Sequence, residues 1–167
     1  MNSRTHQINI AGPVGFIELS IDLPDALQAD PNFAVRGLAL IAHPHPLLGG
    51  TKDNKVVQTL ARTFNQLAYV SVRPNFRGVG LSAGVHDEGR GELSDLLLIS
   101  DWMRTPQSWL PHINHASEQA WVSKVNQLPL VVAGFSFGSY VGSHLVNQLS
   151  ELDKPVERFV MVGSAAG

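Results

Sequence analysis

Cysteine is absent from this sequence of 167 residues. Without thiols the chain can form no disulfide, bind no zinc through thiolates and use no cysteine nucleophile. Charged residues make up only 16% of the chain, and the formal net charge is −2. A chain of this charge has no strong electrostatic attraction to nucleic acid or to an anionic membrane. We therefore expect neither of them as a partner.

Long hydrophobic runs are also missing. No apolar run approaches the length needed to span a membrane, and the N-terminal residues 1–7 lack the apolar stretch of a secretory signal. We therefore expect a cytoplasmic protein. The length, together with a hydrophobic content of 44%, predicts one domain over residues 1–167 with a substantial core.

The apolar patterning predicts strands that alternate with helices. Alternating or short apolar runs, which are typical of strands, cover residues 6–10, 16–23, 37–42, 69–72, 130–133 and 159–162. Apolar residues at helical spacing cover residues 53–68, 91–103 and 138–149. Residues 105–128 are polar and irregular, and we expect a surface excursion with a short helix there. This order predicts an α/β fold, with a mostly parallel sheet and helices on both of its faces.

The most informative segment is Gly134-Phe135-Ser136-Phe137-Gly138. It lies between the predicted strand 130–133 and the predicted helix 138–149, which is the context in which G-x-S-x-G forms a nucleophile elbow. A sharp strand-to-helix turn projects the serine hydroxyl out of the sheet. We expect the two glycines to be required because a side chain would clash where the strand and the helix approach each other. Ser136 is therefore the candidate nucleophile.

A serine that attacks an acyl carbon needs donors for the oxyanion that forms. In the elbow arrangement one donor is the backbone N–H after the nucleophile, here Phe137, and the other comes from the loop after an early strand. That loop is residues 43–50, and Pro44 and Pro46 have no N–H to donate. His45 and Leu47 remain, and we favour His45 because it lies two residues after His43, where the strand gives way to the loop.

Four segments together resemble a known family. H-P-H-P-L-L-G-G (43–50), D-N-K-V-V (53–57), N-F-R-G-V-G-L-S-A-G (75–84) and A-G-F-S-F-G-S-Y-V (133–141) are similar to segments of small, lidless α/β-hydrolases related to bacterial carboxylesterases and dienelactone-type hydrolases. The resemblance covers nearly the whole chain. It implies the α/β-hydrolase fold and a serine hydrolase that cleaves a small carboxylic ester through an acyl-enzyme. It also implies Ser136 as nucleophile, the Phe137 and His45 amides as oxyanion hole, a small acyl substrate and no cofactor.

The sequence departs from this family in one respect. In the fold the chain order is Ser, then Asp or Glu, then His, but no acid follows Glu157 and no histidine follows His144. We expect a chain that is truncated at its C-terminus, with the last strands and the triad acid and histidine missing. The strand 159–162 would then have an unpaired apolar edge, through which we expect the chain to form a homodimer or to aggregate.

The same residues allow other interpretations. The chain is alternatively a non-catalytic α/β-hydrolase-like binding module. No third ligand accompanies His43 and His45, so we expect no metal site. The glycines at 78, 80 and 84 depart from the G-x-G-x-x-G pattern of a dinucleotide-binding loop, so we expect no nucleotide site. We interpret the remaining polar candidates as non-catalytic. Arg73 and Arg77 are expected to be structural, Glu92 and Asp95 to be helix-start acids, and Ser139 and Ser143 to be ordinary helix positions. His112, His115 and His144 are expected at the surface.

Overall fold

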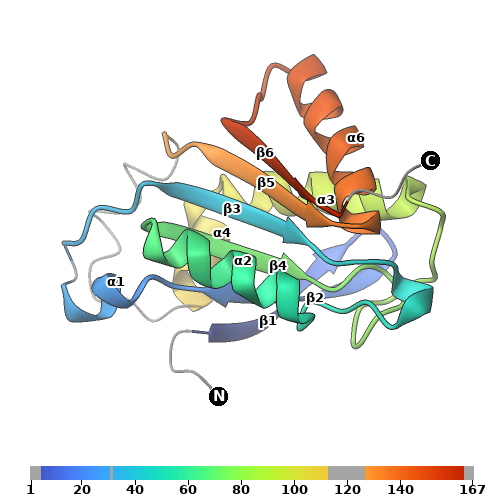
Figure 1. The fold of residues 1–167 in the computed structure, drawn as a ribbon, viewed down its shortest axis with the longest axis horizontal. Helices are drawn as coiled ribbons and strands as arrows, with labels where there is room; N and C mark the ends of the chain where they lie inside the picture. Colours follow the sequence, from blue (N-terminus) through green and yellow to red (C-terminus); the bar gives the residue numbers. More distant parts are fainter. Residues whose placement is uncertain (1–4, 31, 113–126, 164–167) are drawn as a thin grey trace.

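The computed structural model describes residues 5–30, 32–112 and 127–163. In this part of the chain, six strands form one twisted sheet (Figure 1) in the order β1-β2-β4-β3-β5-β6. The strands are β1 (Thr5–Gly12), β2 (Gly15–Asp22), β3 (Gly37–Ala42), β4 (Tyr69–Pro74), β5 (Leu130–Phe135) and β6 (Arg158–Val162). Every strand that the patterning predicts is present, with ends that differ by a few residues at most.

The sheet is mixed and mostly parallel, as the sequence predicted. β1 and β2 form an antiparallel hairpin, and β2 pairs antiparallel with β4. β4, β3, β5 and β6 run parallel to one another. The carboxyl ends of these four strands therefore meet at one edge of the sheet, where ligands bind in open α/β sheets.

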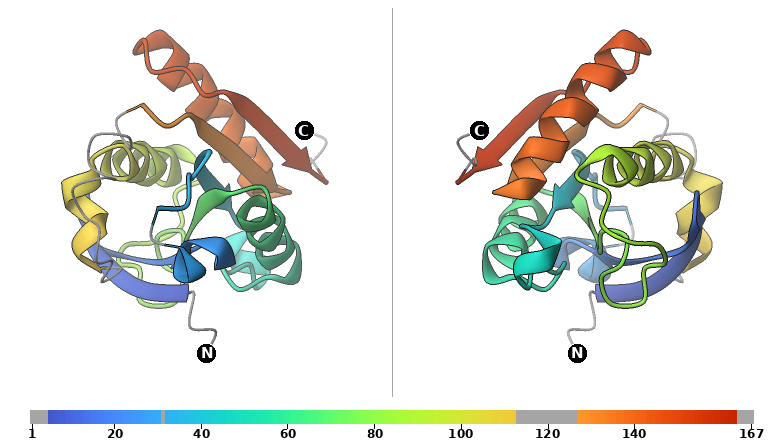
Figure 2. Two further views of the ribbon diagram at one scale, coloured as in Figure 1. Left: turned by 90° about the vertical axis from the view of Figure 1, so that its left-hand side faces the viewer. Right: turned by 90° about the vertical axis from the view of Figure 1, so that its right-hand side faces the viewer.

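Helices cover both faces of the sheet (Figure 2). The helices are α1 (Asp25–Ala29), α2 (Lys55–Gln66), α3 (Arg90–Met103), α4 (Pro106–Trp109) and α6 (Phe137–Glu151), and single 3₁₀ turns are formed by η1 (Pro46–Leu48) and η2 (Leu110–His112). α2 lies on one face, and α3 and α6 lie on the other. Of these helices α1 was not predicted, and α3 begins one residue early because the Glu92 carboxylate accepts the Gly89 N–H at 2.9 Å. Residues 113–126, which include His115 and much of the predicted excursion, lie outside the described residues.

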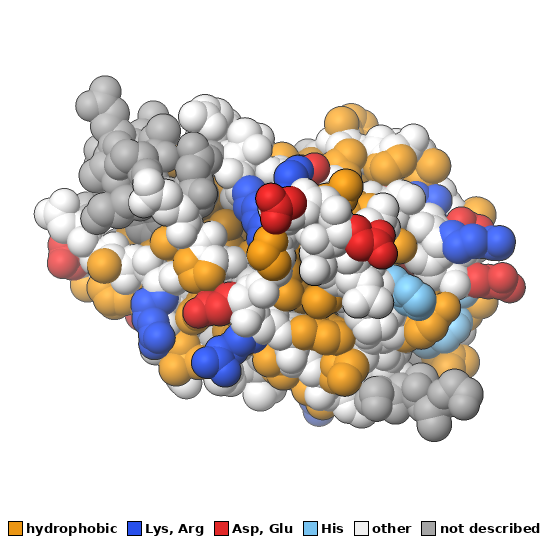
Figure 3. All heavy atoms as spheres, turned by 90° about the horizontal axis from the view of Figure 1, so that it is seen from above, with side chains coloured by type: hydrophobic (Ala, Val, Ile, Leu, Met, Phe, Trp, Pro, Cys, Tyr) orange, Lys and Arg blue, Asp and Glu red, His pale blue; other side chains and the backbone are white. Residues whose placement is uncertain are grey.

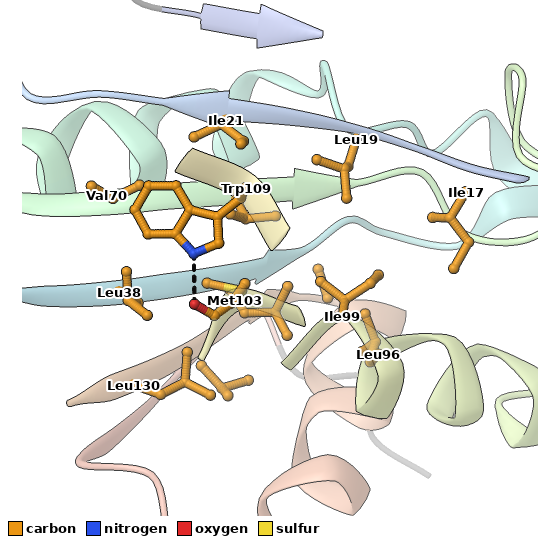
Figure 4. Close-up of a cluster of buried hydrophobic side chains, with 14 of the residues drawn as sticks. Ile17, Leu19, Ile21, Leu38, Val70, Leu96, Ile99, Met103, Trp109 and Leu130 are labelled. Atoms are coloured by element: carbon orange, nitrogen blue, oxygen red, sulfur yellow. Dashed lines mark hydrogen bonds between the residues drawn. The ribbon is translucent and has the colours of Figure 1, made fainter. Parts of the chain in front are cut away.

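The core is split by the sheet because successive side chains of a strand point to opposite faces. On the α2 side, the buried cluster consists of Ala39, Ile41, Val57, Ala61, Phe64, Tyr69, Val131 and Ala133. On the other side, side chains of the same strands pack against α3, α4 and α6 in a larger cluster. Trp109 lies within this larger cluster, and its indole N–H donates to the Met103 carbonyl at 2.8 Å (Figure 4). The polar atom of the largest buried side chain is thereby satisfied.

β6 differs from the other parallel strands in its exposure. Every residue of β3 and β4 is buried, whereas no residue of β6 is fully buried and Met161 is 57% exposed. β6 is also the last strand in the order of the described sheet. This agrees with the expectation of an exposed edge at residues 159–162. None of the described helices is both long enough and apolar enough to cross a bilayer.

Candidate active site

Ser136 lies at the turn between β5 and α6, and its backbone is strained. Its φ of 53° and ψ of −117° are dihedral angles that glycine usually supplies in tight turns, and a residue with a β-carbon adopts them at a cost. Ser136 is the N-cap of α6, but its side chain makes no capping hydrogen bond. N-cap serines normally use their hydroxyl for the helix, so here the hydroxyl is left for another role. The predicted strained elbow is confirmed.

The two glycines of the motif are required by close approach. A β-carbon at Gly134 would lie against the backbone of Gly138 and Ser139. A β-carbon at Gly138 would lie against the carbonyl groups of Ala42 and His43, at the end of β3. The helix therefore begins in direct contact with two neighbouring strand ends, as the sequence predicted for a nucleophile elbow.

The elbow is held by the end of β6. The Ser136 N–H donates to the Val162 carbonyl at 2.9 Å. The Ser139 hydroxyl lies 2.7 Å from the Gly134 carbonyl oxygen and 3.2 Å from that of Val162. The interpretation of Ser139 as an ordinary helix position is therefore wrong: its buried hydroxyl joins the two strands beneath the turn. A serine at the third position of a helix gave no signal for this contact.

His43, at the start of the 43–50 loop, is buried and neutral. Its Nδ1 lies 2.7 Å from the Pro44 carbonyl oxygen, and its Nε2 accepts the Phe76 N–H at 2.9 Å. Burial lowers the pKa of His43 from 6.5 to about 4, and the hydrogen bond to Pro44 opposes this only in part. With both ring nitrogens occupied, His43 cannot accept the proton of Ser136. It joins the ends of β3 and β4 instead.

The two oxyanion donors weighed from the sequence differ in the structure. The Leu47 N–H donates to Nδ1 of His45 at 3.2 Å, so it is already engaged. The His45 N–H donates to no backbone acceptor among the described residues. Phe137 is the first residue of α6, and the N–H groups of a first helical turn have no partner within the helix. The rings of His45 and Phe137 lie 4.9 Å apart, so the structure brings these residues together. Their amides as a shared oxyanion hole remain a prediction.

The 75–89 loop between β4 and α3 is braced by polar contacts. Arg77 forms a two-pronged ion pair with Asp95, at 2.9 and 2.7 Å, and the Asn75 amide donates to Glu18 at 2.8 Å. The Gly78 N–H is within hydrogen-bonding distance of the carbonyls of Ser82 and Ala83. The loop therefore uses the Gly78 amide internally, and α3 begins only at Arg90. Arg77 is structural, as the sequence indicated, whereas Asp95, which was interpreted as a helix-start acid, is the ion-pair partner of Arg77 within α3.

His86 is a site residue that the sequence reasoning missed. Its ring lies 4.9 Å from the ring of His45 and 5.4 Å from that of Phe137. Its Nδ1 is 2.9 Å from the carboxylate of Glu92, which is fully buried. His86 is separated from His45 by a strand and a helix, so no local pattern could have connected them.

Two cavities among the described residues lie away from the elbow. One, of about 610 Å³, is lined by residues of α1, α2 and β2 and by Arg73. The Arg73 side chain is ion-paired with Asp22 at 2.6 Å, which confirms its structural interpretation. The other, of about 650 Å³, lies around Arg104, Leu130 and Lys154. Within the described part of the chain, no group of three or more His, Asp or Glu side chains is placed to hold a metal.

A serine at a strained turn between a parallel strand and the helix that follows it is typical of the α/β-hydrolase class of fold. No family model matches the chain. An uncharacterized protein of Rickettsia prowazekii (strain Madrid E) is 33% identical over 147 residues, which cover 88% of this chain and 52% of that protein. The chain thus spans about half the length of the curated relative that it matches.

Solved structures agree with this class. An α/β serine hydrolase homologue from Coxiella burnetii is 34% identical, with a TM-score of 0.70 over 93% of this chain and 61% of that protein. A lidless α/β serine hydrolase from Xanthomonas campestris is 28% identical, with a TM-score of 0.68 over 96% of this chain and 71% of that protein. The chain therefore has the α/β-hydrolase fold and is similar to lidless α/β serine hydrolases, and the resemblance that its motifs indicated is confirmed.

Proposed function

We propose that this chain carries the nucleophile of a serine hydrolase that cleaves small carboxylic esters through an acyl-enzyme. The observation that supports this best is the conformation of Ser136. Its φ is positive, at 53°, and its hydroxyl makes no capping hydrogen bond to α6. Strain of this kind costs of order 1–3 kcal/mol and persists mainly at functional sites. A serine that only capped α6 would use its hydroxyl for the cap.

The proposed reaction begins when the Ser136 oxygen attacks the ester carbonyl and loses its proton to a base. The carbonyl oxygen becomes an oxyanion, which accepts hydrogen bonds from the Phe137 and His45 amides. Ser136 also lies at the N-terminus of α6, a helix of 15 residues, whose dipole favours negative charge there. Collapse of this intermediate expels the alcohol and leaves an acyl group on Ser136, which water then removes.

We assign the base to a histidine other than His43, because both ring nitrogens of His43 are engaged and its pKa is lowered to about 4. In related enzymes with this elbow, the acid and the histidine follow the serine in the chain. We propose the same order for the whole protein. The 167 residues contain no acid after Glu157 and no histidine after His144.

Hydrolysis of p-nitrophenyl acetate tests the proposal. We expect the 167-residue chain to turn over slowly and Ser136→Ala to change the rate little, because removing a triad member leaves only about 10³–10⁴-fold catalysis. A version that carries the later acid and histidine should be active and should lose that activity in Ser136→Ala. An active version that keeps its rate in Ser136→Ala would refute the proposal. Serine-dependent turnover by the short chain would instead place the base at His45 or His86.

A further inference from the structure

Aromatic rings gather beside Ser136 from three separate segments. His45 comes from the loop after β3, His86 from the loop before α3, and Phe137 and Tyr140 from the first turn of α6. The Phe137 ring lies 4.9 Å from that of His45, 5.4 Å from that of His86 and 6.0 Å from that of Tyr140. These separations are typical of interacting rings. We call these four residues the ring cluster.

The ring cluster is close to the reacting atoms by construction. Phe137 and His45, the proposed amide donors, each contribute a ring as well. A carbonyl group held by these amides would therefore lie next to two residues that also contribute rings, which are 4.9 Å apart. This places the cluster beside the ester that the proposed function requires.

Both histidine rings have a polar group close to Nδ1, and that of His45 is hydrogen-bonded. Nδ1 of His45 accepts the Leu47 N–H at 3.2 Å, and Nδ1 of His86 is 2.9 Å from the Glu92 carboxylate. Glu92 is itself buried, and it accepts the N–H groups of Asp87 at 2.8 Å and Gly89 at 2.9 Å. The hydrogen bond from Leu47 orients the His45 ring, and a ring held in this way contributes a preorganised surface.

The outer side of the ring cluster is accessible and apolar. Tyr140 is 48% exposed, and the neighbouring loop residues Leu47 and Val85 are 71% and 76% exposed. Histidine and hydrophobic side chains lie side by side at one end of the molecule (Figure 3). The inner side is closed by the buried Phe76, whose ring lies 5.6 Å from that of Phe137. Exposed apolar side chains that are gathered at one place favour ligand binding there.

We propose that the ring cluster binds an aryl group of the substrate, so that the site takes esters with an aromatic acid or an aromatic alcohol. This inference rests on the proposed function, because Ser136 and its oxyanion hole position the ester. Tyr140, which is 48% exposed, offers its ring directly to an aromatic ligand, whereas Phe137 is buried and His45 and His86 are only partly exposed. Paired aromatic groups gain affinity beyond the area that they bury, whereas an alkyl group would gain only from its area.

The inference can be tested without turnover by binding carboxylates, which resemble the acid product of ester hydrolysis, to the 167-residue chain. Benzoate and cyclohexanecarboxylate have the same charge and similar size, and only benzoate is aromatic. We expect backbone amide NMR spectra to show benzoate binding about threefold or more tightly than cyclohexanecarboxylate. Tyr140→Leu, which keeps an apolar side chain, should abolish this preference, and Leu152→Ala, at another exposed apolar position, should preserve it. Equal affinities, or a preference that survives Tyr140→Leu, would overturn the inference.

Further ligands separate the inference from the proposed function on which it rests. If acetate and benzoate shift the Phe137 and His45 amides equally, the oxyanion hole stands and the aryl site is wrong. If benzoate binds with an aryl preference but shifts neither amide, the aryl site stands and the oxyanion hole is wrong. Benzyl alcohol distinguishes the two sources of the aryl group. If the chain binds benzyl alcohol more tightly than cyclohexylmethanol, the ring cluster binds the alcohol part of the ester.

Discussion

Replacing Ser136 by glycine should stabilise the chain relative to replacing it by alanine. Both variants remove the hydroxyl, and they differ only by a β-carbon at φ 53° and ψ −117°. Glycine relieves strain of about 1–3 kcal/mol and costs about 0.5–1 kcal/mol of chain entropy. We expect a net gain of about 1 kcal/mol, which corresponds to a rise in Tm of about 2–4 °C for a domain of this size.

Urea and thermal unfolding of the two Ser136 variants measure this difference directly. Ser143, about two turns further along α6, provides the matched control because its backbone is ordinary helix. There the order should reverse, with Ser143→Gly about 1 kcal/mol less stable than Ser143→Ala. If Ser136→Ala is as stable as Ser136→Gly while the control behaves as expected, the turn stores no strain and the reasoning about the elbow fails.

Two further predictions concern protonation and the sheet edge. Burial lowers the pKa of His43 from 6.5 to about 4, so its contribution to stability is complete above pH 6.5 and is lost as the pH falls toward 4. This loss amounts to about 3 kcal/mol, because the unfolded state binds a proton that the folded state does not; histidine NMR that shows His43 titrating near pH 6.5 would contradict it. We also propose that the 167-residue chain forms a homodimer or aggregates through the edge of β6, and that Met161→Lys weakens this association. Light scattering after size exclusion should show it, and a monodisperse, heat-stable monomer of the unsubstituted chain would exclude it.

The fold followed closely from local pattern because each strand is a short apolar run between turn residues. The runs at 37–42 and 130–133 are apolar throughout, and the structure buries them on both faces of the sheet. α1 escaped prediction because its five residues have no capping hydrogen bond from a side chain and no full turn of apolar spacing. A helix this short is formed by its tertiary contacts, which the sequence does not display.

The elbow could be predicted because its requirements are local. Two glycines, one serine, a strand before and a helix after all lie within 20 residues of sequence. The contacts of His86 could not be predicted, because they depend on how the 75–89 loop folds back against the loop after β3. The bond between His43 and the Phe76 N–H escaped for the same reason, since Phe76 is 33 residues away along the chain. Side-chain partners across loops require the three-dimensional arrangement.

The hydrogen bond from the Ser136 N–H to the Val162 carbonyl links the nucleophile to the edge of the sheet. A local opening that frees the end of β6 must also break this bond, so the turn cannot keep its full support while the edge strand is detached. Amide hydrogen exchange at Ser136 should then follow the opening of β6 rather than that of β5, although Ser136 is continuous with β5. The backbone geometry of Ser136 thus depends on the pairing of β6. A group that binds the outer edge of β6 would therefore stabilise the turn at Ser136 without contacting Ser136.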